Sequence, residues 1–193
     1  MKKNLVTASL MTVATTILLG IIYPLVVTGL AQVLFHDRAN GQLIVVNGKT
    51  VGSRIIGQAF SGPAYFHSRP SSAGTGYQAD NSNGSQLGPT NHQLIDRVKA
   101  DTAALQAENP NAAVPVDLVT TSASGLDPEI TPAAAAFQIP RVAKARGITE
   151  DKLGLMVAKH TQGRQFGFLG EPRVNVLELN LELDQQFPPP PAH

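Results

Sequence analysis

The chain opens with a long apolar segment, because residues 4–35 contain no Asp, Glu, Lys, Arg or His. About 20 consecutive apolar residues are enough to cross the hydrocarbon core of a bilayer as a helix, and this segment is longer. Lys2 and Lys3 precede it, and Asp37 and Arg38 follow it. The pattern predicts a single N-terminal transmembrane helix.

The charged residues beside this segment predict its orientation. Because Lys and Arg stay on the cytoplasmic side, Lys2 and Lys3 place the N-terminus in the cytoplasm and the rest of the chain outside it. A cleaved signal peptide is the alternative, with Gly29-Leu30-Ala31 as the cleavage site. Its apolar core would be roughly twice the usual 7–15 residues. We therefore expect an uncleaved, single-pass anchor in the cell (inner) membrane.

One face of the anchor carries a small residue at every fourth position, namely Ala8, Thr12, Thr16 and Gly20. Small side chains at this spacing allow another transmembrane helix to approach closely. Membrane helices are often rich in Gly and Thr, so chance is the alternative explanation. We expect this face to contact a partner in the membrane.

Strands are predicted near both ends of the segment beyond the anchor. Residues 42–56 contain two apolar runs, one on each side of Asn47-Gly48. This dipeptide is favoured in the type I′ turn of a β-hairpin, so the segment predicts a hairpin. Residues 114–119 form a short extended stretch. Leucine at every second position from 177 to 183, with polar residues between, predicts a half-buried strand.

Three helices are predicted between these strands, each from a residue that caps helices through its side chain. Strands at both ends with helices between them predict an α+β domain with a small sheet. The three helices run from Thr90 or Asn91 to about Glu108, from Thr131-Pro132 to Gly147, and onward from Thr149.

Two polar loops, 61–91 and 115–128, are the candidate functional segments. The first is rich in Gly, Ser, Asn and Pro yet contains three aromatic residues, which a disordered segment would lack. Long ordered loops are uncommon in compact domains and usually functional. The loop residues that we select as contact candidates are Arg69, Ser85, Gln86, Asn91, Ser122, Ser124 and Asp127.

Composition narrows the function classes. The chain of 193 residues has 15 Lys and Arg against 14 Asp and Glu, so nothing indicates a nucleic-acid partner. It has no Cys, which excludes a disulfide framework and thiol chemistry. We divide it into a cytoplasmic stub and anchor (1–35), one extracytoplasmic domain (36–187) and a disordered tail (188–193).

No catalytic motif is present, and the histidines at 36, 67, 92, 160 and 193 do not have metal-ligand spacing. Ser122, Ser124 and Asp127 share a loop, but no base lies near them in sequence. Their simpler role is to bond the local backbone in turns. We therefore assign no catalytic and no metal-binding residue.

Five segments occur in one order along the chain: G-Q-A-F with Y-F-H-S-R-P-S (57–60, 65–71), G-S-Q-L-G-P-T-N (84–91), P-V-D-L-V-T-T-S-A-S-G-L-D-P (115–128), R-V-A-K-A-R (141–146) and G-E-P-R-V-N-V-L-E-L-N (170–180). Together they resemble the KdpC family, the C subunit of the bacterial Kdp potassium-transporting P-type ATPase. Gln86 stands where the family pattern has Asn.

The resemblance implies a single-span accessory subunit without catalytic residues of its own, needed for assembly and activity. It implies three partners: a channel-like potassium-binding subunit, an ATP-hydrolysing subunit and a small fourth subunit. It also implies a catalytic chaperone that raises the pump subunit's affinity for ATP, and ATP enters as a cofactor on this ground alone. The alternative is an anchored extracytoplasmic hydrolase or binding protein that acts alone.

Overall fold

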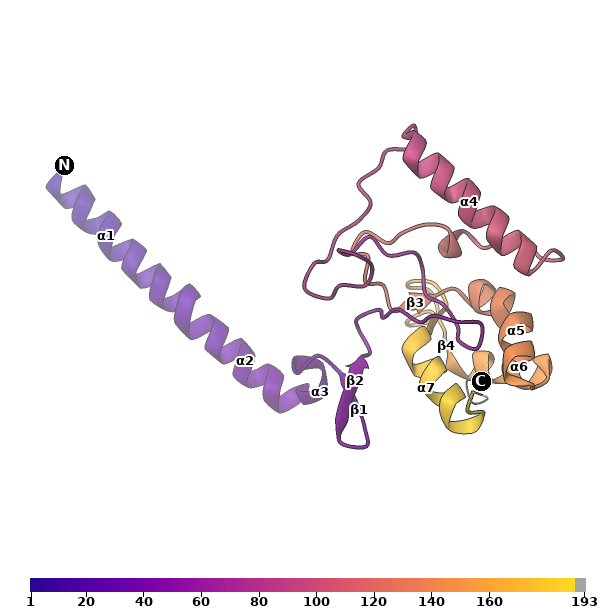
Figure 1. Cartoon of the computed structure of the whole chain (residues 1–193). Coiled ribbons are helices and arrows are strands. Elements are labelled where there is room, and N and C mark those ends of the chain that lie inside the picture. The colour runs from indigo at the N-terminus through magenta and orange to yellow at the C-terminus, as the bar shows by residue number, and fades with distance from the viewer. Residues whose placement is uncertain (190–193) are drawn as a thin grey trace. The chain divides into compact units, whose positions relative to one another are not determined.

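In the computed structural model, which describes residues 1–189, the apolar segment forms one long helix (Figure 1). It comprises α1 (Lys2–Ile17), the π-helical turn η1 (Leu18–Ile22) and α2 (Tyr23–Leu34). The helix of 33 residues is long and apolar enough to cross a membrane. At η1 the Tyr23 N–H bonds to the carbonyl of Leu18, five residues back. This widened turn directly precedes Pro24, which has no N–H to donate.

A short helix, α3 (His36–Ala39), and a hairpin of β1 (Leu43–Val46) and β2 (Lys49–Ser53) follow the anchor. Asn47 and Gly48 at its tip have φ values of 52° and 77°. Two positive φ values are what a type I′ turn requires. The predicted hairpin is confirmed, although its second strand begins and ends earlier than expected. The chain forms two compact units, Met1–Val51 and one that begins at Gly52.

The backbone from 54 to 91 contains neither helix nor strand, although the sequence predicts that the hairpin extends to residue 56. It leads into α4 (His92–Glu108), which begins where expected because the Asn91 side chain accepts the Gln93 N–H at 2.8 Å. No residue of α4, which is described throughout, is fully buried.

The prediction of an extended stretch at 114–119 is wrong, because Val116–Leu118 forms a single 3-10 turn, η2. Its buried Asp117 accepts the main-chain N–H of Thr131 at 2.7 Å and the Thr131 hydroxyl at 3.2 Å. The 3-10 turn places the Asp117 carboxylate against both donors of Thr131. These two hydrogen bonds satisfy a buried charge and so stabilise the turn over an extended conformation.

Two of the predicted helices, α5 (Pro132–Arg146) and α6 (Glu150–His160), are confirmed. The Thr131 hydroxyl accepts the Ala134 N–H at 3.1 Å and caps α5. Gly147, with φ of 68°, ends α5 in the left-handed conformation that glycine tolerates. Thr149 occupies the N-cap position of α6, but its side chain makes no capping hydrogen bond.

The strand predicted at 177–184 is wrong, because these residues lie in a helix, α7 (Val176–Gln186). Asn175 caps it by accepting the Glu178 N–H at 3.1 Å. Val176, Leu179 and Leu183 are at most 1 % exposed, and their spacing of three and four residues is helical. The leucines at 177, 179, 181 and 183 lie on neighbouring faces of this helix, and their two-residue spacing resembles the pattern of a strand.

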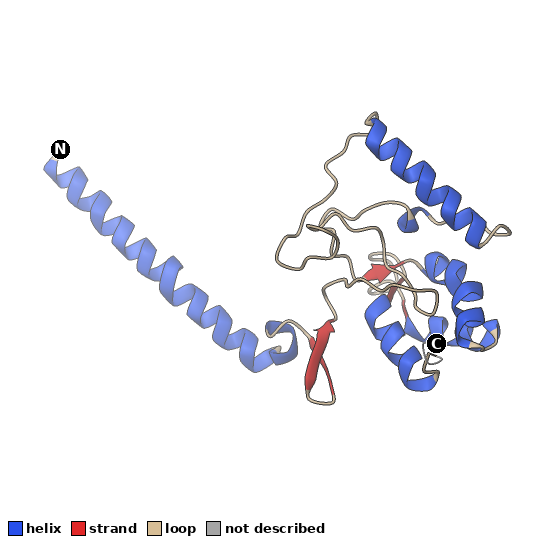
Figure 2. Ribbon diagram, viewed as in Figure 1, coloured by secondary structure: helices blue, strands red, loops and turns tan. Residues whose placement is uncertain are grey.

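The main sheet has three short antiparallel strands in the order β3 (Glu129–Ile130), β5 (Arg173–Asn175) and β4 (Thr161–Gln162). The predicted mixed architecture with a small sheet is therefore confirmed, but the described domain has four long helices (α4–α7) instead of three (Figure 2). Buried side chains from α5, α6, α7, β3 and β5 form its core, joined by Phe66 from the long loop. Most of the predicted tail lies at 190–193, outside the described residues.

Candidate functional site

The two candidate loops meet at Arg69. Its Nη1 lies 3.1 Å from Oδ2 of Asp127, and both side chains are half-buried. Its Nε donates to the carbonyl of Thr120 at 3.3 Å. One guanidinium therefore joins the 61–91 loop to the 115–128 loop, through a charge-assisted contact and a backbone contact.

The backbones of the same loops approach each other very closely. At Gly125, whose φ is 67°, a Cβ atom would lie 2.5 Å from the carbonyl oxygen of Asn83 and 2.6 Å from the amide nitrogen of Ala73. The Asn83 N–H donates to the carbonyl of Ser124 at 2.9 Å. Only glycine fits at such a crossing, so the loops are held in one arrangement.

The polar side chains of the 115–128 loop are used locally. Ser122 Oγ accepts the N–H three residues further on at 2.9 Å, and Ser124 Oγ accepts the N–H two residues further on at 3.1 Å. Asp127 Oδ1 likewise accepts the second N–H after it, at 3.0 Å. These are turn-building bonds, and the simpler role expected for the three side chains is confirmed.

The remaining loop candidates lie apart from Arg69. Gln86 has φ of 52°, and its Nε2 donates to Oδ1 of Asn83 at 2.8 Å. Ser85 and Gln86 line a polar cleft of about 540 Å³ together with Ser122. Asn91 serves as the cap of α4. The structure therefore places Ser85, Gln86 and Ser122 on a surface shared by the two loops.

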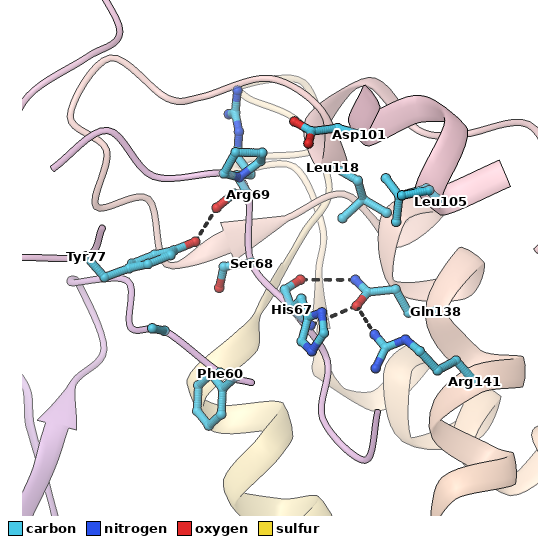
Figure 3. A pocket seen from close by; sticks show the side chains of 13 residues that line it. Phe60, His67, Ser68, Arg69, Tyr77, Asp101, Leu105, Leu118, Gln138 and Arg141 are labelled. Atoms are coloured by element: carbon cyan, nitrogen blue, oxygen red, sulfur yellow. Dashed lines mark hydrogen bonds between the residues drawn. The ribbon is translucent and has the colours of Figure 1, made fainter. Parts of the chain in front are cut away.

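A second cleft, of about 370 Å³, opens beside Arg69 (Figure 3). Its walls come from the long loop, from α4, from η2 and from α5, and they mix apolar with polar side chains. They include Phe60, His67, Ser68, Arg69, Tyr77, Asp101, Leu105, Leu118, Gln138 and Arg141.

Tyr77 fixes one end of this cleft. Its hydroxyl donates to the carbonyl of Arg69, and in Figure 3 the hydroxyl of Ser68 lies near the phenol. Burial, as the main cause, raises the pKa of Tyr77 to about 12. The phenol therefore keeps its proton at physiological pH and remains a hydrogen-bond donor.

Two buried amides give the long loop the partners that a neighbouring strand would supply. Oε1 of Gln138 accepts the His67 N–H at 2.8 Å, and its Nε2 donates to the His67 carbonyl at 3.0 Å. Asn180 makes the same pair with Phe66, both at 2.9 Å. Helices α5 and α7 thus hold residues 66–67 from two sides, and Phe66 is driven into the core with no exposed surface.

Two titratable side chains of the cleft, His67 and Arg141, also have partners within the domain. His67 Nε2 lies 2.8 Å from the carbonyl of Gly62 and is therefore the protonated nitrogen. Burial first, and then the charge of Arg141, lower the pKa of His67, which keeps the ring neutral. Arg141 pairs with Glu108 at 2.6 Å. These contacts hold the cleft walls in one conformation. Among the described residues, no group of three or more potential metal ligands occurs.

Sequence patterns missed the side chains that hold this site together. Arg146 has no exposed side-chain surface, donates to the carbonyl of Ala64 at 2.8 Å, and pairs with Asp184 at 2.8 Å. Its guanidinium also stacks 4.7 Å from the ring centroid of Tyr65. The only signal for Gln138, Asn180 and Arg146 is a polar residue on a helix face that is otherwise apolar.

In the anchor, the predicted contact face of Ala8, Thr12, Thr16 and Gly20 presents only small side chains. The Thr12 hydroxyl donates to the carbonyl of Ala8 at 2.9 Å, so its polarity is turned back onto its own helix. A Cβ atom at Gly20 would meet nothing closer than Cγ2 of Thr16 at 3.8 Å. The backbone at Gly20 is therefore open to a neighbouring helix.

The similarity to known proteins spans the anchor and the domain. The family model "K+-transporting ATPase, c chain" (KdpC) matches residues 5–185. The chain is 66 % identical over 190 residues to the potassium-transporting ATPase KdpC subunit of Koribacter versatilis, covering 98 % of each protein. It is 58 % identical over 182 residues to the protein of the same name from Acidobacterium capsulatum, covering 94 % of this chain and 98 % of that one.

Proposed function

The chain belongs to the KdpC family, and on this basis we propose that it is a non-catalytic accessory subunit of a high-affinity, ATP-driven potassium uptake complex. The observation that carries this proposal is the match of the K+-transporting ATPase c-chain family over residues 5–185. The site agrees with it, because the Arg69–Asp127 pair and the close backbone approach at Gly125 hold the two loops in one arrangement.

The proposed partners are a channel-like potassium-binding subunit, an ATP-hydrolysing subunit and a small fourth subunit. In the membrane, the anchor face of Ala8, Thr12, Thr16 and Gly20 docks on a partner helix. Small side chains and the open backbone at Gly20 support this, since close packing drives association where lipid removes the hydrophobic effect. The 61–91 and 115–128 loops cover a partner's surface outside the membrane.

The domain lies on the extracytoplasmic side, a proposal that rests on Lys2 and Lys3 ahead of the anchor. ATP is then on the opposite side of the membrane. The proposed chaperone effect on ATP affinity therefore passes through the assembled complex, without direct contact between this domain and the nucleotide. Protease added to spheroplasts, from which the outer membrane has been stripped, tests the orientation: the domain should be cut, and protection from cleavage would contradict it.

Affinity purification from mild detergent tests the function itself. Recovery of a large P-type pump and a channel-like protein with the tagged chain is the expected result. Recovery of the chain alone, with hydrolytic or ligand-binding activity in its domain, would instead favour an anchored protein that acts by itself.

A further inference from the structure

Ser68 carries a buried hydroxyl that the domain itself does not use. Its Oγ is buried, yet no residue within the described range 1–189 makes a hydrogen bond with it. The nearby phenol of Tyr77 gives its proton to the carbonyl of Arg69, so it donates nothing to Ser68. Buried polar groups in native proteins have partners, and one without a partner lowers the stability of the fold. The Ser68 hydroxyl therefore requires a partner from outside the domain.

This hydroxyl belongs to the wall of the cleft of about 370 Å³, where Figure 3 shows Ser68 between Tyr77 and His67. Much of the remaining wall is apolar, and its largest apolar side chains are Phe60, Leu105 and Leu118. Ligand sites in proteins typically measure roughly 300–1,000 Å³ and combine apolar walls with a few polar groups. The cleft lies at the small end of that range, so its size suits a single ring with its substituents.

The charges of the cleft wall favour a neutral ligand. Each charged side chain in the wall is paired with an opposite charge. The pairs are Arg69–Asp127 at 3.1 Å, Arg141–Glu108 at 2.6 Å and Asp101–Arg97 at 3.1 Å. The His67 ring is neutral as well, because burial and the charge of Arg141 lower its pKa. An anion or a cation in the cleft would meet charges that are already compensated, so the wall gives neither of them an advantage.

Two polar groups of the wall remain for a ligand. The Ser68 hydroxyl can both donate and accept a hydrogen bond. The Nε2 hydrogen of His67 is used on the carbonyl of Gly62 at 2.8 Å, so Nδ1 of the neutral ring is an acceptor. A phenol matches this wall, because its hydroxyl is a donor and an acceptor in one atom and its ring is apolar. A phenylalanine ring would leave Ser68 without a partner, and an indole offers only a donor.

We propose that this cleft binds a phenol ring, supplied as a tyrosine side chain by another subunit of the transport complex. The ring packs against Phe60, Leu105 and Leu118, and its hydroxyl bonds to Ser68. Tyrosine is among the side chains that most often anchor an interface by filling a pocket on the partner. The identity of the partner rests on the proposed function, whereas the preference of the cleft for a phenol can be tested on this chain alone.

Binding of p-cresol, which is the tyrosine side chain as a free molecule, tests the cleft without the complex. The full chain is held in lipid nanodiscs with isotope-labelled leucine methyl groups, and the chemical shifts of Leu105 and Leu118 report binding. The free concentration is measured in the aqueous phase, because the probe also enters lipid. We expect p-cresol to shift both signals and to bind about three- to tenfold more tightly than toluene, which lacks the hydroxyl. Equal binding of the two probes, or no shift with p-cresol, would overturn the proposal and leave water as the partner of Ser68.

Two substitutions separate binding from folding. Ser68→Ala removes a hydroxyl that the fold does not use, so we expect an unfolding midpoint that is unchanged or higher, with p-cresol bound no better than toluene. Ala104→Leu extends a side chain of the cleft wall and should abolish the p-cresol shifts. Ala103→Leu makes the same change at the neighbouring exposed position of α4 and should leave them unchanged. A lower unfolding midpoint for Ser68→Ala would show that the fold itself uses the hydroxyl, and the proposal would fail.

The source of the ring is tested in the detergent-solubilised complex. Ala104→Leu should weaken retention of the chain by about tenfold relative to Ala103→Leu, because a blocked cleft excludes the tyrosine of the partner. Wild-type retention of Ala104→Leu would overturn the assignment to a partner's tyrosine, and p-cresol binding would then indicate a free phenol as the ligand. Recovery of the wild-type chain without any other subunit would instead count against the proposed function.

Discussion

Replacing Asn180 with leucine removes both hydrogen bonds that the helix α7 makes to Phe66. Asn180 and Phe66 have no exposed surface, and the two bonds are both 2.9 Å long. Leucine has the same branched outline and is somewhat bulkier, so the change leaves no cavity. It leaves one buried N–H and one buried carbonyl without their partners, each costing about 1–3 kcal/mol. We expect the free energy of unfolding to fall by about 2–6 kcal/mol, a large share of the roughly 5–15 kcal/mol typical of a domain.

Urea unfolding of the full chain in mild detergent, followed by circular dichroism, measures this loss. The matched control is Gln93→Leu, which makes the same kind of amide-to-leucine change at an exposed position of α4. We expect the control to lie within about 0.5 kcal/mol of the wild type. If Asn180→Leu were as stable as the control, the loop at Phe66 would not depend on this amide, and the reasoning would be refuted.

Three further predictions concern charge, pH and the anchor. Arg146→Met keeps much of the buried side-chain volume but strands the carbonyls that Arg146 binds, so the midpoint of urea unfolding should fall clearly. Burial lowers the pKa of His67 from 6.5, so the unfolded chain binds more protons than the folded one and stability should fall as pH drops below about 6.5. His67→Gln should flatten that part of the unfolding profile. Thr16→Leu with Gly20→Leu should reduce co-purification of the complex, whereas Leu10→Ala on the same helix should not. An unchanged yield from the double variant would contradict the docking face.

Local chemistry explains why several elements could be predicted from the sequence. The turn at Asn47-Gly48, the cap at Asn91 and the start at Thr131-Pro132 each depend on residues within four positions of one another. Such interactions exist before the chain has folded. The apolar anchor segment is read just as directly, because its length and lack of charge leave few alternatives.

Residues 176–186 show where a local pattern misleads. Leucine at 177, 179, 181 and 183 satisfies the two-residue period of a strand. The side chains that become buried are Val176, Leu177, Leu179, Asn180 and Leu183, a helical set that includes a polar residue. Asn180 is buried because it binds the backbone at Phe66, 114 residues earlier. A contact that distant contributes nothing to periodicity, so the pattern alone favoured the strand.

The candidate site depends on the same kind of distant contact. Its long loop has no strand to bind, and buried side chains of the helices bind its backbone instead. Gln138 binds His67, Asn180 binds Phe66, and Arg146 binds Ala64. Each replaces one or two ladder hydrogen bonds with a side-chain bond that is equally satisfied. A loop held in this way keeps its shape without a partner. It is therefore preformed for the proposed contact with the transport complex, whereas a disordered segment would lose conformational entropy on binding.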